Sequence, residues 1–335
     1  MQPVTLTLPP KKQQAESARQ PRPDAAHRKP CGRQEAFPVR RLHLSETELP
    51  PPRLILMKHL VNELVDDAAQ RHESKQTGKP MGAVTGFGKL DRELGSSLST
   101  GLHILHGSPG SGKSAFALQM ACQSRCPAMY LTCEMAPLEL LRRITSRLSG
   151  QYLGRFKTGE MTPEAVSGYA ESAVGQIPML SMLDATRTAA TRADLQQAAE
   201  KTRKLDPDNP HLLIIVDSVH SWVRGWQSEA DEYNALNTGL DILRSMAQEL
   251  NCAIVGIGER NRSSMKEGGQ SASAGTRSFE YASESVIELQ AVKSKGDNDA
   301  DGKTHIEVTL SKNRNGSLRK FDYLFEGRIQ SFEEI

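Results

Sequence analysis

The chain has few aromatic residues and lacks a long apolar run. Of its 335 residues, 5% are aromatic and 37% are hydrophobic, which predicts that part of the length lies outside any packed core. No apolar stretch approaches the roughly 20 residues that cross a bilayer. The first residues, MQPVTLTLPPKK, have too short an apolar segment for a secretory signal. We therefore expect no membrane partner.

Cysteine is also scarce. The chain has five cysteines, an odd number without a repeated spacing: Cys31, Cys122, Cys126, Cys133 and Cys252. This pattern argues against a disulfide framework and predicts a reducing compartment, the cytoplasm. The pair at 122 and 126 has helical spacing, but no second pair of metal ligands follows it. We interpret these two residues as small buried apolar side chains rather than zinc ligands.

Charge and proline are concentrated at the beginning of the chain. Residues 1–42 carry a net charge of +6 and the remainder −4, and residues 1–52 contain ten prolines. Such a segment cannot bury enough apolar surface to offset its ordering entropy. We predict that residues 1–53 form a disordered basic arm. Its function is either an electrostatic tether for nucleic acid or that of a tail without a specific role.

Residues 54–79 are predicted to form an amphipathic helix followed by a linker. Apolar residues recur there at helical spacing, namely Met57, Leu60, Val61, Leu64 and Val65. The segment SKQTGKP then ends the pattern. An isolated apolar stripe needs a surface to cover it, either the chain's own domain or a neighbouring subunit.

From residue 80 to residue 335 the sequence predicts an α/β domain. Apolar runs typical of strands alternate with helical segments, and these runs are 102–107, 128–134, 178–184, 212–218, 252–259 and 285–292. Continuous apolar strands alternating with helices predict a mostly parallel sheet that is buried on both faces. The alternating segments around 311–316 predict a β-hairpin at the end of the chain.

The segment GSPGSGKS, residues 107–114, matches the phosphate-binding loop pattern G-x-x-x-x-G-K-[ST]. A predicted strand precedes it and a predicted helix follows it, as the pattern requires. Lys113 is expected to reach the β- and γ-phosphates, and Ser114 to ligate Mg²⁺. We predict ATP and Mg²⁺ as cofactors, with nucleotide contacts from Gly107, Ser108, Pro109, Gly110, Ser111, Gly112, Lys113, Ser114 and Ala115.

Two carboxylates follow predicted strands and are candidates for the chemistry. Asp217 ends the apolar run LLIIVDS, at the sheet edge where ligands bind in open α/β folds, and is expected to hold Mg²⁺ through water. Glu134 ends the strand after the loop's helix. It is our candidate general base for the attacking water; a favourable contact with a helix N-terminus is the alternative.

Seven segments together resemble a known family: TGFGKLDRELG, GSPGSGKSAFALQMA, YLTCEM, IIVDS, RSMAQELN, ERNRS and SKNRNG. They occur in the order and spacing of the helicase domain of DnaB-like replicative helicases, from about residue 54 to the end. These are RecA-fold ATPases, and bacterial RadA is a close cousin. The resemblance implies a RecA-like core and ATP-driven movement on single-stranded DNA. It also implies a homo-oligomeric ring, a hexamer, that acts in DNA replication.

The resemblance also implies roles for single residues. Glu134 matches the catalytic glutamate and Asp217 the aspartate of the second nucleotide-binding motif. Lys312 and Arg314 match a basic pair that reaches the γ-phosphate of the neighbouring subunit, where it stabilises transition-state charge. The helix before TGFGKLD resembles the linker helix that packs on the next subunit in such rings.

The chain departs from the family in two respects. Glu259 stands where the family usually has a glutamine that donates a hydrogen bond to the γ-phosphate. An ionised glutamate would repel that phosphate, so either Glu259 points elsewhere, paired with Arg260, or nucleotide sensing is altered. The proline-rich arm stands in place of the folded primase-binding domain, and it is a candidate site for partners in replication or repair. Two other functions stay open: a RadA-like DNA repair or recombination ATPase, and a nucleotide-gated assembly protein without unwinding activity.

A basic, glycine- and serine-rich segment is the candidate contact with DNA. It spans residues 260–277 and carries four cations, Arg260, Arg262, Lys266 and Arg277. Its glycines allow close approach to phosphates, and the cations supply affinity without sequence preference. The two tryptophans, Trp222 and Trp226, are candidates for stacking on bases, for a subunit contact or for packing within the protein.

Overall fold

The computed structural model describes residues 54–225, 232–258, 278–292 and 302–335. In these residues nine strands form one sheet in the order β3-β2-β4-β5-β1-β6-β7-β8-β9. The neighbours from β3 to β6 pair in parallel, and those from β6 to β9 pair antiparallel. The strands are β1 (Gly101–Gly107), β2 (Ala128–Thr132), β3 (Leu180–Asp184), β4 (Leu213–Asp217), β5 (Ala253–Ile257), β6 (Ser285–Ala291), β7 (Lys303–Asn313), β8 (Arg319–Glu326) and β9 (Ser331–Glu334).

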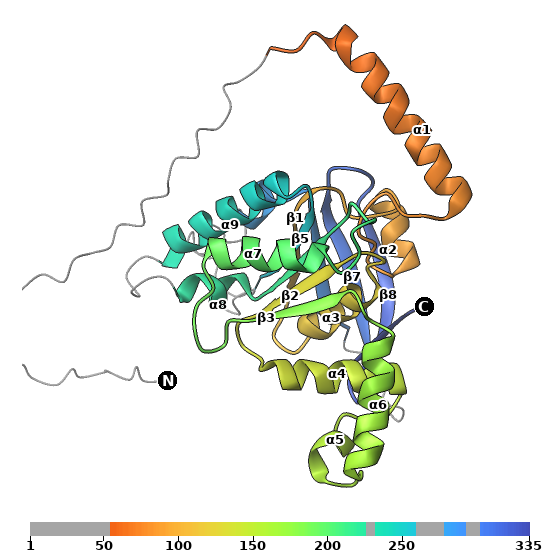
Figure 1. Ribbon diagram of the computed structural model, residues 1–335, viewed down its shortest axis with the longest axis vertical. Coiled ribbons are helices and arrows are strands. Elements are labelled where there is room, and N and C mark those ends of the chain that lie inside the picture. Colours follow the sequence, from red (N-terminus) through yellow and green to blue (C-terminus); the bar gives the residue numbers. More distant parts are fainter. Residues whose placement is uncertain (1–53, 226–231, 259–277, 293–301) are drawn as a thin grey trace, which may run out of the picture. The chain divides into compact units, whose positions relative to one another are not determined.

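Helices cover both faces of this sheet (Figure 1). Side chains of α2, α3 and α4 pack on one face, and those of α7, α8 and α9 on the other. The helices are α1 (Val61–Thr77), after the short 3-10 helix η1 (Met57–Leu60), α2 (Gly88–Glu93), α3 (Lys113–Gln123), α4 (Pro137–Ser149), α5 (Arg155–Thr158), α6 (Pro163–Gly175), α7 (Arg192–Arg203), α8 (Val219–Arg224) and α9 (Glu232–Glu249).

The continuous apolar strands follow from this two-sided burial. Along β4, Leu213 and Ile215 belong to the cluster beneath α3, whereas Ile214 and Val216 belong to the cluster beneath α8 and α9. Successive side chains of a strand point to opposite faces, so both sets must be apolar when helices cover both faces. The predicted α/β fold with a mostly parallel sheet is confirmed, and so is the C-terminal hairpin, formed by β7 and β8.

Some elements were not predicted, and others lie outside the described residues. The short helix α2, the α5–α6 segment and the edge strand β9 carry no strong periodic signal.

The proposed arm at 1–53 lies outside the described part, so the domain boundaries stay a prediction. The short helix η1 presents an exposed apolar side chain at Met57, and α1 presents three more at Val61, Leu64 and Val65. None of the helices in the described ranges combines the length and the apolar character that crossing a bilayer needs.

A buried histidine links the start of β1 to its neighbours. His103 Nδ1 lies 2.8 Å from the Ser285 hydroxyl and Nε2 lies 2.8 Å from the Ser99 carbonyl oxygen. Burial lowers the pKa of His103, because desolvation disfavours the charged imidazolium. The histidine is therefore neutral in the folded protein at neutral pH.

We expect this histidine to make the free energy of unfolding depend on pH. Its folded pKa lies below the unfolded value of about 6.5, so the unfolded chain binds more protons, and stability is lost as the pH falls below about 6.5. Each pH unit costs up to about 1.4 kcal/mol until the folded pKa is reached. Urea unfolding at pH 7.5 and 5.5 should show a smaller pH effect for His103→Gln than for the wild type. An equal pH effect in both proteins would contradict the assignment.

Candidate active site

The phosphate-binding loop lies between β1 and α3. Gly110 and Gly112 have φ values of +82° and +86°, a backbone conformation that favours glycine. A Cβ at residue 112 would lie 2.7 Å from the Phe332 ring, so this position also needs glycine for space. Lys113 Nζ donates to the main-chain oxygens of Gly107 at 2.9 Å and Ser108 at 3.2 Å. The lysine therefore folds back over the loop, where phosphate oxygens would bind.

Two hydrogen bonds from a side-chain amide of α3 hold strand β9 next to this loop. Gln119 of α3 donates from Nε2 to the Phe332 oxygen at 3.0 Å, and its Oε1 accepts from the Phe332 N–H at 2.8 Å. The Phe332 ring stacks on Phe325 with centroids 4.4 Å apart. The last strand thus supports both the loop and one wall of the site.

Asp217 ends β4 beside the loop, in the position predicted for a magnesium-binding carboxylate. Its Oδ2 accepts a hydrogen bond from the Tyr130 hydroxyl at 2.6 Å. Burial raises the pKa of Asp217, and hydrogen bonds from Tyr130 and Ser114 act in the opposite direction. The hydroxyl of Ser114 and this carboxylate supply the hard oxygen donors that Mg²⁺ prefers, so these residues fit that ion.

Glu134 lies just beyond β2 and is exposed, with two serines fixing its carboxylate. The Ser218 and Ser221 hydroxyls donate to Glu134 Oε1 at 2.8 Å and 2.5 Å. The Ser218 hydroxyl oxygen also accepts the Ser221 N–H at 3.3 Å, which caps α8. Both serines bond the same carboxylate oxygen, so Oε2 can accept a proton from water.

These side chains share one pocket of about 330 Å³. Its lining includes Lys113, Ser114, Glu134 and Asp217, together with Gly110, Gly112 and Ala115 of the loop. The structure therefore brings together the predicted phosphate, metal and general-base residues. All of them lie at the carboxyl ends of parallel strands, where open α/β sheets bind ligands.

The pocket is also lined by residues that the sequence analysis did not select, among them Arg143, Phe325 and Gln330. Arg143 of α4 donates from Nη1 to Gln330 Oε1 at 2.6 Å, and Phe325 of β8 lines the same wall. Phe325 and Gln330 lie more than 200 positions after the loop in the chain, and none of the three residues belongs to a short motif. Only the packing of β8 and the turn before β9 against α4 places them beside the loop.

Lys312 and Arg314 lie far from this pocket. The Arg314 N–H donates to the Glu284 oxygen at 3.1 Å, and the Glu284 N–H donates to the Leu102 oxygen at 2.7 Å. Leu102 precedes Gly107 by five positions on β1, which is about 16 Å along a strand. The basic pair therefore lies toward the amino ends of the parallel strands, at the sheet edge opposite the phosphate-binding loop of its own chain.

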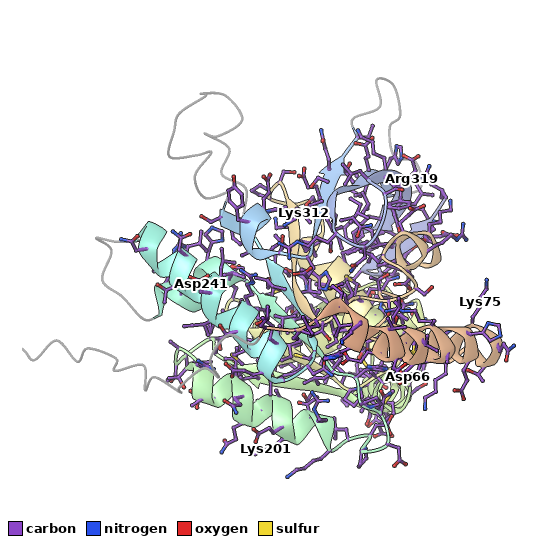
Figure 2. All side chains as sticks on the ribbon, turned by 90° about the horizontal axis from the view of Figure 1, so that it is seen from above. Asp66, Lys75, Lys201, Asp241, Lys312 and Arg319 are labelled. Carbon is purple, nitrogen blue, oxygen red and sulfur yellow. The ribbon has the colours of Figure 1, made fainter. Side chains whose placement is uncertain are left out.

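Neighbouring groups in the same chain hold both cations. Arg314 Nη1 lies 2.8 Å from Glu284 Oε1. Lys312 Nζ donates to the main-chain oxygens of Ser283, at 2.5 Å, and Glu280. Figure 2 shows Lys312 beside the helical residues 278–282, which lead to these carbonyl groups. Burial, as the largest cause, lowers the pKa of Lys312.

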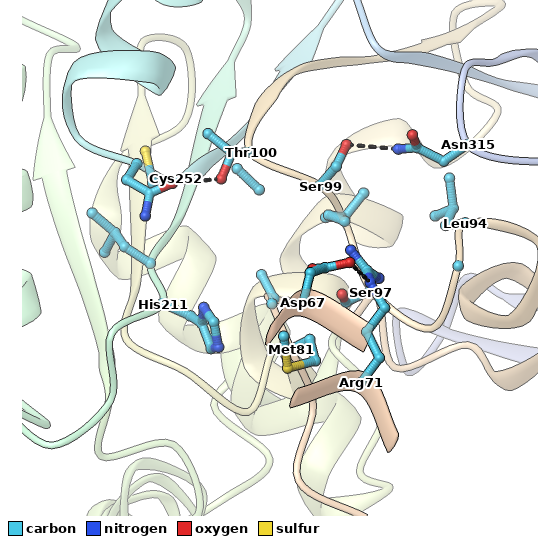
Figure 3. Close-up of a pocket in the computed structure, with 17 residues that line it drawn as sticks. Asp67, Arg71, Met81, Leu94, Ser97, Ser99, Thr100, His211, Cys252 and Asn315 are labelled. Carbon is cyan, nitrogen blue, oxygen red and sulfur yellow. Dashed lines mark hydrogen bonds and ion pairs between the residues drawn. The ribbon is translucent and has the colours of Figure 1, made fainter. Parts of the chain in front are cut away.

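Two asparagines fix the hairpin tip to the segment before β1. Asn313 donates from Nδ2 to the Glu93 oxygen at 2.7 Å, and Asn315 donates from Nδ2 to the Ser99 hydroxyl at 2.9 Å. Figure 3 shows the second of these bonds at the rim of a hollow of about 590 Å³. This hollow is larger than the pocket of the phosphate-binding loop, but it contains no residue of that loop. We therefore do not assign the chemistry to it.

Several predicted contacts lie outside the described residues. These are Glu259, Trp226 and the four candidate DNA-binding cations, Arg260, Arg262, Lys266 and Arg277. Trp222 is described and is 1% exposed, and its Nε1 donates to the Ala190 oxygen at 2.8 Å. Its interpretation as a base-stacking residue is wrong, and the alternative, packing within the protein, is confirmed.

A comparison with models of protein families shows to which family the chain belongs. The model of the DnaB-like helicase C terminal domain matches residues 82–334, which is most of the chain. The chain belongs to this DnaB-like family. The match includes the phosphate-binding loop, both carboxylates and the hairpin, so the predicted resemblance is confirmed.

Individual relatives of this DnaB-like chain are distant. It is 24% identical over 293 residues to the replicative DNA helicase DnaB of Treponema pallidum, with 83% of this chain and 61% of that protein covered. It is 29% identical over 182 residues to the Gene 65 protein of Mycobacterium phage L5, with 54% of this chain and 65% of that protein covered. The chain thus spans less than two thirds of the length of either relative.

Solved structures show the same fold. One is a DnaB-like replicative helicase, described with its interactions with primase, at a TM-score of 0.63 and 16% identity, covering 83% of this chain and 71% of that chain. Another is a KaiC-like protein from Pyrococcus horikoshii, at 0.51 and 15%, covering 76% of this chain and 99% of that chain. The predicted RecA-like architecture is confirmed.

Proposed function

We propose that the chain is an ATP-hydrolysing DNA helicase or translocase of the DnaB-like type. In this proposal, ATP and Mg²⁺ bind at the phosphate-binding loop, with Lys113 on the phosphates and with Ser114 and Asp217 toward the metal. Magnesium supplies charge neutralisation at the phosphates. Glu134, held by its two serines, accepts the proton of the attacking water.

The position of Arg314 is the observation that carries the proposal. It lies at the amino ends of the parallel strands, whereas its own phosphate-binding loop lies at their carboxyl ends. About 16 Å of strand separates the two ends. An arginine that stabilises the transferred phosphate must contact it directly. Arg314 is too far from the phosphate-binding loop of its own chain to make such a contact. It would therefore act on the nucleotide of a neighbouring copy. Hydrolysis would then require an assembly.

The exposed apolar side chains of α1 support assembly in a second way. Val61, Leu64 and Val65 are between 56% and 69% exposed, although their helical spacing is that of a buried face. We propose that a neighbouring copy covers this face, and that the assembled copies form a ring, a hexamer as in the family. Single-stranded DNA would pass through the ring and contact the segment at 260–277.

The experiment measures ATPase activity and strand displacement with the same preparation. ATPase activity should rise more steeply than the protein concentration and should increase when single-stranded DNA is added, and a forked duplex should be unwound with ATP. DNA stimulation without unwinding would favour the repair or recombination ATPase. ATP turnover that does not change when DNA is added would overturn the helicase proposal. It would favour the nucleotide-gated assembly protein without unwinding activity. Lys113→Ala provides the inactive control.

A further inference from the structure

We propose that Glu284 is a positioning residue, which orients Arg314 for its contact with the phosphate of a neighbouring copy. The inference rests on the proposed function, because it needs Arg314 to act across an interface. Glu284 lies on the short connection between the helical residues 278–282 and β6. It touches neither the phosphate-binding loop nor the carboxylates of its own site.

The two side chains contact each other directly, and they differ in solvent exposure. Glu284 Oε1 lies 2.8 Å from Arg314 Nη1, and the arginine side chain is 46% exposed whereas the glutamate side chain is 22% exposed. The more buried carboxylate can therefore hold the more exposed guanidinium. A guanidinium has five N–H donors in a rigid fork, so a bond through Nη1 leaves donors for phosphate oxygens.

The main chain fixes Glu284 from both sides. Its N–H donates to the Leu102 oxygen at 2.7 Å, and its carbonyl oxygen accepts the Arg314 N–H at 3.1 Å. Gly101 makes room for the side chain, because a Cβ there would lie 2.5 Å from Glu284 Cγ. The carboxylate therefore has a defined position relative to β1. Its bond to the guanidinium fixes the orientation of the Arg314 side chain.

Orientation is a stronger reason for this pair than stability. An ion pair as exposed as this one contributes little to folding. A displacement of about 1 Å in a catalytic contact, however, can lower a rate about 100-fold. Lys312 offers no equivalent test of positioning, because its acceptors are main-chain oxygens, which no side-chain substitution removes. Glu284 is therefore the side chain whose substitution tests the orientation of Arg314.

The test compares Glu284→Gln with Glu249→Gln in the full-length protein. Glu249 is an exposed glutamate that also pairs with an arginine, Arg192, at 2.6 Å, so its substitution makes the same change in net charge and also breaks an ion pair. We expect Glu284→Gln to lower kcat about fivefold to tenfold, with the KM for ATP and the binding of a fluorescent ATP analogue changed less than about twofold. Glu249→Gln should leave all three values unchanged. Glu284→Asp, which keeps the charge on a shorter side chain, should recover part of the loss.

A double substitution separates positioning from a structural effect. In an Arg314→Lys background, which removes the guanidinium fork, Glu284→Gln should lower kcat less than about twofold, because the two residues act as one unit. An equal loss in both backgrounds would overturn the inference, as would a Glu284→Gln protein that turns over like the Glu249→Gln control. Urea unfolding midpoints within error of the wild type identify folded variants.

The outcome for Arg314 itself distinguishes the two proposals. If Arg314→Ala keeps full turnover, the action across an interface is wrong, and the inference about Glu284 is overturned with it. If Arg314→Ala is inactive while Glu284→Gln is fully active, only the inference about Glu284 is overturned.

Discussion

Replacing Arg314 with alanine should abolish ATP turnover while nucleotide binding is retained. The guanidinium supplies positive charge to the transition state, and arginines in this role contribute about 10³- to 10⁵-fold to kcat. Nucleotide binding should survive because the substitution lies at the sheet edge opposite the variant's own phosphate-binding loop. Steady-state phosphate release and binding of a fluorescent ATP analogue measure the two effects.

Mixing this variant with Glu134→Gln should restore part of the activity. Arg314→Ala keeps an intact Glu134, and Glu134→Gln keeps an intact Arg314, so an interface between the two can contain one complete site. Activity should depend on the mixing ratio and reach a maximum when both proteins are present. The absence of any rescue, or full activity of Arg314→Ala alone, would contradict action across an interface.

Glu134→Gln alone should reduce turnover by about 100- to 10,000-fold. Glutamine has the same shape and can still accept the hydrogen bonds of Ser218 and Ser221, so the site should keep its geometry and its affinity for ATP. It cannot accept a proton from water, however, and that step should be lost. Single-turnover hydrolysis and nucleotide binding, measured on the same preparation, separate the two properties.

A glutamate elsewhere in the chain provides a matched control. Glu171 of α6 also accepts a hydrogen bond from a serine, Ser167, at 2.7 Å, but does so on the surface. Glu171→Gln should therefore turn over ATP like the wild type. If Glu134→Gln were as active as this control, the assignment of the general base would be wrong.

Much of the candidate site could be predicted because its residues belong to local patterns. The glycines and Lys113 form one continuous motif, and Glu134 and Asp217 each follow an apolar strand. Parallel strands of one sheet end at the same edge, so residues after different strands can be placed together before the sheet order is known. The structure brings Gly110, Gly112 and Lys113 into one pocket with Glu134 and Asp217.

The remaining features depend on packing that no local pattern contains. The contact between Arg143 and Gln330 requires β8 and the turn before β9 to pack against α4. The pair of Glu284 and Arg314 requires the register of β6 and β7, which is interrupted by an irregularity between Val286 and Ile287. The sequence predicted the hairpin and its cations, but it gave no indication of the carboxylate beside them.

The hydrogen bonds between Gln119 and β9 have a practical consequence for the placement of fluorescent labels. The Phe332 ring limits the space at Gly112, and the Phe332 main chain is bonded to the Gln119 side chain of α3. A label attached within residues 331–334 would therefore disturb the strand that supports the phosphate-binding loop. Labels for kinetic work belong elsewhere, for example on exposed residues of α6.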